Sequence, residues 1–146
     1  PLRLVGSEMC IRDSPKDHCM KIVTNLWEGL GAAVFTIDPV RHDEIMSYAS
    51  HLPHVISYAV LNSIMKNSNK DITTFSAGGL KDFVRIAGSD PKMWTDIFLS
   101  NKESILKAID AYKDSLDEIK ELVESENEKE LQDLLGSIKE YKNSKF

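Results

Sequence analysis

The spacing of apolar residues predicts a chain built mainly from helices. Between Cys19 and Leu30, apolar side chains recur every three or four residues, which places them on one face of a helix, and Gly31 is suited to cap its end. Residues 32–37 (AAVFTI) are a short apolar run that stops at Asp38-Pro39, the pattern of a strand followed by a turn. We therefore expect one helix and one strand before residue 38.

The sequence changes character at Asp38, because an acidic residue followed by proline is a helix start signal and everything downstream has helical spacing. Pro53 lacks a backbone donor and crowds the preceding turn, so the HLPH stretch, residues 51–54, is expected to kink or break this helix. Residues 55–65 are apolar on nearly every side. That pattern predicts a helix in the middle of a bundle.

Four further helices follow. Gly78-Gly79 opens one that stops at Gly88, and Asp90-Pro91 opens the next. The last part of the chain predicts an antiparallel helical hairpin, with a capping box at Ser125 and Glu128 starting its second helix. Its apolar positions are Ile105, Ile109, Tyr112, Leu116, Ile119 and Val123, then Leu131, Leu134, Leu135 and Ile138. The many Glu and Lys residues between them are expected to form a solvated face.

Composition narrows the possible partners. The formal charge of −5 and the pI near 5.4 argue against nucleic acid, and the apolar stretches are too short to span a membrane. Cys10 and Cys19 fit neither a disulfide framework nor a zinc site, so we interpret them as reduced thiols of a cytoplasmic protein. Residues 1–14 show no periodicity and no signal-peptide pattern, and we leave them as an unassigned, possibly artefactual, tail.

Three of the four histidines, His42, His51 and His54, cluster around the predicted kink and first suggest a metal site. Their spacing argues against one, because His51 and His54 straddle a proline and no HExxH is present. Structural hydrogen bonds by His42 and His51, and a ligand-facing role for His54, are the alternatives that remain.

Arg85 follows Asp82 by about one helical turn, so a carboxylate could hold its guanidinium while the remaining donors face an anion. The plain alternative is a surface ion pair of little energetic value. Gly78 could let a ligand approach the backbone or could simply make a turn. Trp94 fits either core packing or an interface anchor. The sequence contains no GxGxxG, the glycine-rich turn of dinucleotide-binding folds.

Two ordered motifs, HDExxxxxSHLPH in residues 42–54 and GGxxDFxRIAxSDPxMWxDIFxxNK in residues 78–102, resemble the C-terminal domain of prephenate dehydrogenases. The resemblance extends from about residue 15 to about residue 120. It implies a helical dimerisation bundle like the C-terminal domain of 6-phosphogluconate dehydrogenase in residues 39–146. Residues 15–38 would then be the last helix and strand of a Rossmann domain.

The resemblance implies oxidative decarboxylation of prephenate, or of arogenate, with NAD or NADP in tyrosine biosynthesis. Arg85 would hold the ring carboxylate with Asp82 beside it, His54 would face the substrate side chain, and Gly78 would lie close to the ligand. Lys81 and Trp94 would reach the site of the other subunit of a homodimer, while His42 and His51 would support the site.

The family's catalytic histidine and its cofactor loop have no match in this sequence, so we expect the chain alone to be inactive and to bind no cofactor. The main alternative is a non-catalytic dimerisation or regulatory module that binds an aromatic acid such as tyrosine, which is also a candidate inhibitor of the enzyme.

Overall fold

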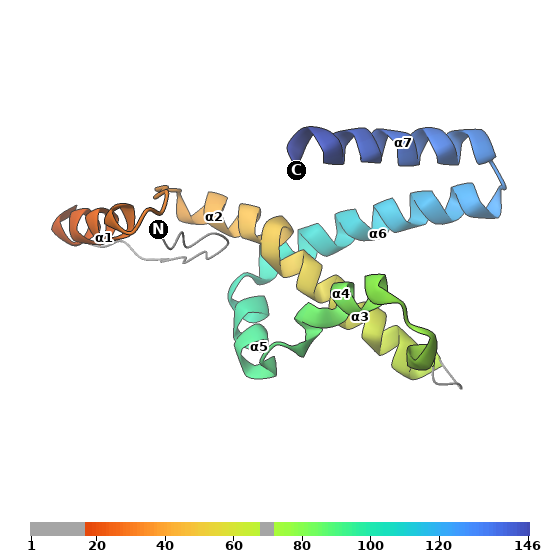
Figure 1. The fold of residues 1–146 in the computed structure, drawn as a ribbon, viewed down its shortest axis with the longest axis horizontal. Coiled ribbons are helices and arrows are strands. Elements are labelled where there is room, and N and C mark those ends of the chain that lie inside the picture. The colour runs from red at the N-terminus through yellow and green to blue at the C-terminus, as the bar shows by residue number, and fades with distance from the viewer. Residues whose placement is uncertain (1–16, 68–71) are drawn as a thin grey trace. The chain divides into compact units, whose positions relative to one another are not determined.

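The computed structural model describes residues 17–67 and 72–146, and every regular element among them is a helix (Figure 1). The expectations for Cys10 and for residues 1–14 fall outside the described part. The chain divides into two compact units, one ending at Met46 and the other comprising Ser47–Phe146. The prediction of a mainly α-helical protein is confirmed.

The first unit contains α1 (Asp17–Gly29) and α2 (Pro39–Met46). Gly31 ends α1 as predicted, with a φ of +88°, a left-handed conformation that glycine adopts without strain. The amide of Gly31 donates to the Glu28 carbonyl at 2.9 Å, and the amide of Ala32 donates to the Trp27 carbonyl at 3.0 Å. These two bonds form a Schellman motif.

The predicted strand at residues 32–37 is wrong, since this segment has no regular secondary structure. A strand is stabilised by hydrogen bonds to a neighbouring strand, and no strand exists among the described residues to supply them. Phe35, in the middle of the run, is 79% exposed. The helix that follows does start as predicted, because the Asp38 carboxylate accepts from the amides of Val40 at 2.9 Å and Arg41 at 3.3 Å.

The second unit begins with the irregularity expected around Pro53. A π-helical turn, η1 (Ser47–His51), leads into α3 (Leu52–Asn67), so the proline falls in the first turn of α3. Proline cannot donate the backbone hydrogen bond that a continuous α-helix would need there, and a wider π-turn accommodates that missing donor. The helix is therefore interrupted directly beside the two histidines, His51 and His54.

The other elements of this unit are η2 (Ile72–Phe75), α4 (Gly78–Val84), η3 (Arg85–Gly88), α5 (Pro91–Ser100), α6 (Lys102–Glu124) and α7 (Glu128–Lys145). In this unit α4, η3 and α6 pack against α3, and α5 and α7 pack against α6. As predicted, α5 starts at Asp90-Pro91, where the Asp90 carboxylate accepts from the Met93 amide at 2.7 Å. No helix in the described part of the chain has the length and apolarity needed to cross a membrane.

The core of this unit is small. Where the structure describes this unit, its buried apolar side chains come from α3, α5 and α6 and are Leu52, Trp94, Ile105 and Ala108. The expectation that α3 is enclosed on all sides is wrong for the single chain, because most of its apolar side chains are only half-buried and Met65 is 80% exposed. A helix this apolar and this exposed indicates a surface that another protein surface covers.

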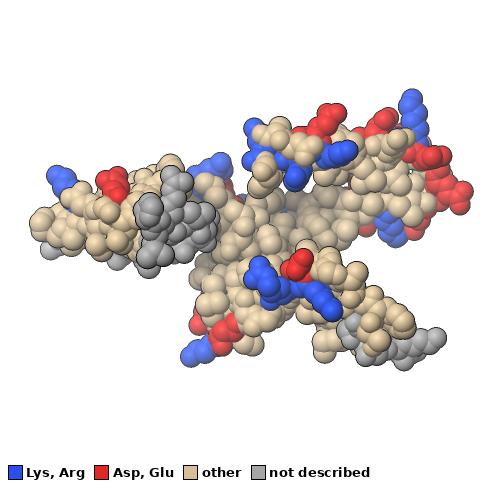
Figure 2. Space-filling view, in the orientation of Figure 1, with Lys and Arg blue, Asp and Glu red and all other residues tan. Residues whose placement is uncertain are grey.

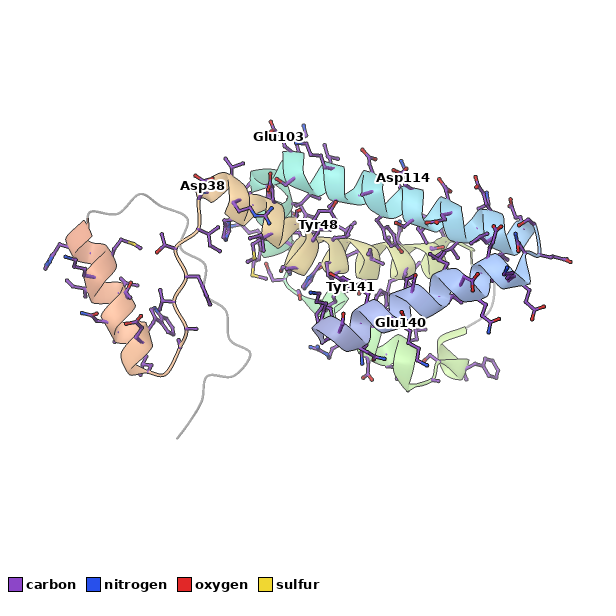
Figure 3. All side chains as sticks on the ribbon, turned by 90° about the horizontal axis from the view of Figure 1, so that it is seen from above. Asp38, Tyr48, Glu103, Asp114, Glu140 and Tyr141 are labelled. Carbon is purple, nitrogen blue, oxygen red and sulfur yellow. The ribbon has the colours of Figure 1, made fainter. Side chains whose placement is uncertain are left out.

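The predicted hairpin is confirmed by the antiparallel arrangement of α6 and α7 (Figure 1). The predicted capping box is wrong by two residues. Ser125 is the C-cap of α6, and Asn127 is the N-cap of α7, where its side-chain oxygen accepts from the amide of Glu130 at 3.3 Å. Glu126, with a φ of 52°, makes the turn between them. Figure 2 shows acidic and basic side chains over the hairpin, and Figure 3 shows Glu103 and Asp114 pointing outward from α6.

Candidate functional site

Two of the predicted site residues, His54 and Trp94, form a direct stack. Their ring centroids lie 3.5 Å apart with an interplanar angle of 21°. Trp94 is 6% exposed and also contacts Phe98, at 5.4 Å, while His51 meets it edge-on at 6.2 Å. The turn before Pro53 and helix α5 thus bring together residues that are about forty positions apart.

The hydrogen bonding of His54 determines which of its nitrogens faces a ligand. Its Nδ1 lies 3.0 Å from the carbonyl oxygen of Ser50, one turn earlier. Because a carbonyl only accepts, Nδ1 carries the proton in this bond. No hydrogen bond joins Nε2 to any residue that the structure describes, and the side chain is half-buried. His54 therefore presents Nε2 as its free polar atom.

Arg85 is held close to α3 by two hydrogen bonds on either side of it. The fully buried Ser57 hydroxyl donates to the Phe83 carbonyl at 3.3 Å, and the Tyr58 hydroxyl donates to the Ser89 carbonyl at 3.4 Å. Ser57 and Tyr58 lie one turn beyond His54 on the same helix. The segment that carries Arg85 is therefore fastened to the helix that carries His54.

The expected ion pair between Asp82 and Arg85 is absent, although both residues are described. Helix α4 ends at Val84 and Arg85 begins the 3-10 turn η3, so the two side chains do not share one regular helix. Both are exposed, and a solvated pair gains little. The Arg85 guanidinium consequently has no carboxylate partner among the described residues.

The remaining predicted residues differ in exposure. Gly78 and Lys81 are exposed on α4, the helix that leads to Arg85, and a Cβ at Gly78 would meet nothing within 4 Å. Gly78 is thus not required by packing in this chain. Trp94 is buried inside its own chain, as its core-packing interpretation predicts, and its expected reach across a dimer stays a prediction. Figure 2 shows charged side chains over the region of α4.

His42 belongs to the first unit and has a structural hydrogen bond, with its Nδ1 3.1 Å from Oδ1 of Asp43. Its Nε2 is buried and lacks a hydrogen-bond partner in the described residues. Across residues 17–67 and 72–146, no three His, Cys, Asp or Glu side chains are grouped so as to hold a metal ion. Cys19 is exposed.

Asn101 is a residue of this site that the sequence reasoning missed. Its side-chain amide lies 3.1 Å from Nδ1 of His51, and it is 7% exposed. The two residues are 50 positions apart, so no local pattern predicts the contact; the only sequence signal was the place of Asn101 at the end of the longer motif.

An apolar groove of about 320 Å³ lies between α3, α5 and α6 and is lined by Val55, Tyr58, Phe98, Lys102, Ile105, Leu106 and Ile109. It does not include Arg85, His54 or Gly78. Its lining is almost entirely apolar and contains none of the predicted site residues, so we assign the candidate site to the Arg85 and His54 region instead.

Comparisons with a family model, with curated proteins and with solved structures all point to the same group of dehydrogenases. Residues 38–137 match the family described as "Prephenate dehydrogenase, dimerization domain". A prephenate dehydrogenase of Bacillus subtilis is 34% identical over 121 residues, covering 82% of this chain and 33% of that protein. A cyclohexadienyl dehydrogenase of Zymomonas mobilis is 31% identical over 108 residues, covering 72% of this chain and 37% of that protein.

Among solved structures, prephenate dehydrogenase from A. aeolicus in complex with hydroxyphenyl propionate and NAD+ superposes with a TM-score of 0.82 and 39% identity. The match covers 88% of this chain and 46% of that one. The chain thus spans about a third of the length of its curated relatives and less than half of the solved one. On the extent of the family match, the chain belongs to the prephenate dehydrogenase dimerisation-domain family.

Proposed function

We propose that this chain supplies the substrate-binding and dimer-forming half of a prephenate or arogenate dehydrogenase that uses NAD or NADP in tyrosine biosynthesis in the cytoplasm. The observation that carries the proposal is the Arg85 guanidinium, which has no carboxylate partner among residues 17–67 and 72–146 and lies on a segment hydrogen-bonded to the helix of His54. Prephenate is a dianion, and a guanidinium binds a carboxylate through two parallel charge-assisted hydrogen bonds.

The other residues take complementary roles in this proposal. The free Nε2 of His54 hydrogen-bonds the substrate side chain, and exposed Gly78 lets the ligand approach the α4 backbone. Asp82, which does not pair with Arg85 here, and Lys81 are exposed on α4 for contacts with ligand or with the other subunit. The solved relative bound hydroxyphenyl propionate, an aromatic acid whose carboxylate is on the side chain, the part of the ligand that His54 would face.

Exposed apolar surface on the single chain supports the proposed homodimer. Apolar side chains of α3, α6 and α7 are 45–80% exposed, among them Met65, Leu116, Val123, Leu135 and Ile138. Soluble proteins rarely leave so much apolar surface in water, so we expect a second copy to cover it in a domain of this family.

In the first unit, α1 has an exposed apolar stripe, with Ile22 and Leu26 more than half exposed. This stripe fits the edge of a larger α/β domain.

NAD or NADP would be held by residues that this sequence lacks, because it contains no GxGxxG. The cofactor would accept hydride from the substrate while carbon dioxide leaves. The part of this chain in that reaction is binding and orientation of the substrate carboxylate and side chain. Tyrosine, an aromatic acid with its carboxylate on the aliphatic chain attached to the ring, is the inhibitor that the same site would accept.

Substituting Arg85 tests the binding role. We expect Arg85→Ala to weaken binding of prephenate about 10- to 100-fold, because the charge-assisted hydrogen bonds to its ring carboxylate contribute about 1.5–3 kcal/mol. Arg85→Lys should recover only part of the affinity, since an ammonium keeps the charge and loses the planar fork. The measurement is an NMR titration of the acid into each variant, which detects weak binding.

Lys113→Ala is the matched control, since it removes one positive charge from an exposed ion pair on α6. It should bind the acid as the parent does. Equal affinity in the parent and in Arg85→Ala, with the dimer intact in both, would contradict the proposal and favour the non-catalytic module.

A further inference from the structure

Asn101 stands at the start of α6 but does not cap it. Asparagine is among the preferred capping residues, and a side-chain cap contributes about 1 kcal/mol. The backbone of Asn101 occupies the N-cap position and its carbonyl accepts from the Ile105 amide at 3.1 Å, yet its side chain makes no cap hydrogen bond. The side chain is directed elsewhere while being 7% exposed.

The buried amide of Asn101 contacts His51 instead. Nδ2 of Asn101 lies 3.1 Å from Nδ1 of His51. An amide nitrogen only donates, so Nδ1 of His51 accepts, and the proton of the neutral imidazole is on Nε2. His54 has the opposite arrangement, because its Nδ1 donates to the Ser50 carbonyl. The two histidines on either side of Trp94 are therefore opposite tautomers.

The ring of Trp94 links the Asn101–His51 hydrogen bond to His54 in the candidate ligand site. His51 meets Trp94 edge-on, with centroids 6.2 Å apart and planes at 80°, and the face of Trp94 stacks on His54. The plane of Trp94 sets the plane of His54, and the bond to Ser50 fixes the rotation of His54 within that plane. Together these contacts determine where Nε2 of His54 points.

We infer that Asn101 is a positioning residue: by holding His51 in its Nε2-protonated tautomer against the edge of Trp94, it fixes the orientation in which His54 meets a ligand. The inference rests on the proposed function for the identity of that ligand, but the tautomers and the stack are properties of the chain itself. The side-chain amide of Asn101 contacts His51, and His51 in turn meets Trp94, so the effect of Asn101 on His54 passes through these two rings.

The most informative variant is Asn101→Asp. Aspartate has nearly the same shape as asparagine, but it must accept a hydrogen bond where the asparagine amide donates one. A carboxylate only accepts, so His51 must place a proton on Nδ1 to keep the contact. Aspartate is also a good N-cap residue, which protects the stability of α6. We expect long-range ¹⁵N NMR to show Nε2–H at His51 in the parent and Nδ1–H in Asn101→Asp, with Nδ1–H at His54 in the parent.

The variant should also weaken binding of hydroxyphenyl propionate about 3- to 10-fold, the effect of roughly one misplaced hydrogen bond. A double-mutant cycle separates positioning from stability. In a His51→Ala background, Asn101→Ala should change the affinity for hydroxyphenyl propionate less than about twofold. The His51 ring, through which Asn101 acts on Trp94 and His54, is already absent there. In a Trp27→Phe background Trp94 is the one tryptophan of the chain, and its emission should change in Asn101→Asp.

Three results would overturn the inference: an Nδ1–H tautomer of His51 in the parent, unchanged affinity and Trp94 emission in Asn101→Asp, or an equal loss of affinity from Asn101→Ala with and without His51. Failure of the proposed function looks different, since the parent itself would not bind hydroxyphenyl propionate. The tautomers and the Trp94 emission would then still decide whether Asn101 positions His51 and Trp94.

Discussion

Trp94→Ala is expected to destabilise the helical unit by about 3–5 kcal/mol, the usual cost of truncating a buried aromatic side chain. Trp94 is the largest buried apolar side chain among the described residues of this unit, and it contacts His51, His54 and Phe98. Small domains are stable by only about 5–15 kcal/mol. The variant should therefore unfold at a temperature well below the thermal unfolding midpoint of the parent. Thermal unfolding followed by circular dichroism at one fixed protein concentration measures the effect.

Two companion variants sharpen this test. Trp94→Phe should be milder, because it keeps an aromatic ring and removes the indole N–H, which is buried without a hydrogen-bond partner in the described residues. Phe75→Ala is the matched control, as it deletes an aromatic ring that is 88% exposed and should leave the midpoint nearly unchanged. If Trp94→Ala unfolds with the same midpoint as Phe75→Ala, the core described here is not the one that holds the unit together.

The chain of 146 residues is expected to give no NAD- or NADP-linked oxidation of prephenate. Hydride transfer needs a bound nicotinamide, and the sequence contains no glycine-rich turn to hold the pyrophosphate of a dinucleotide. It also contains no match to the family's catalytic histidine. His51, His54 and His42 are each engaged in a hydrogen bond, with Asn101, the Ser50 carbonyl and Asp43 respectively.

Absorbance at 340 nm, recorded with prephenate and either cofactor, reports this activity directly. A prephenate dehydrogenase such as that of Bacillus subtilis, assayed in the same buffer, is the positive control. A rate above the protein-free background, abolished by Arg85→Ala, would show that chemistry as well as binding resides in these residues and would contradict our assignment of roles.

Local signals in the sequence predicted the helix boundaries well, because each depends on neighbouring residues. Asp38 and Asp90 cap their helices, and Gly31 ends α1 in the left-handed conformation that its sequence position indicates. Where two capping residues lie close together, the choice depends on the turn: Glu126 takes a positive φ, and Asn127 rather than Ser125 starts α7. Such a choice is not determined by residue type alone.

Features that depend on distant partners were not predictable from the pattern. Residues 32–37 have a strand-like composition, but a strand needs a neighbour, and none exists among the described residues. The exposure of α3 likewise depends on what covers it outside the single chain. In the candidate site, the stack of His54 on Trp94 and the contact of Asn101 with His51 join residues 40 and 50 positions apart. Periodicity carries no information at that range.

The central claim is that these residues hold an aromatic carboxylate and do not bind the cofactor. One NMR experiment tests both parts, by titrating hydroxyphenyl propionate and then NAD+ into the ¹⁵N-labelled chain. We predict that the acid shifts signals of Gly78, Arg85 and the His54 ring and that NAD+ shifts none. Saturable shifts with NAD+, or acid-induced shifts confined to the α6–α7 hairpin, would contradict the account.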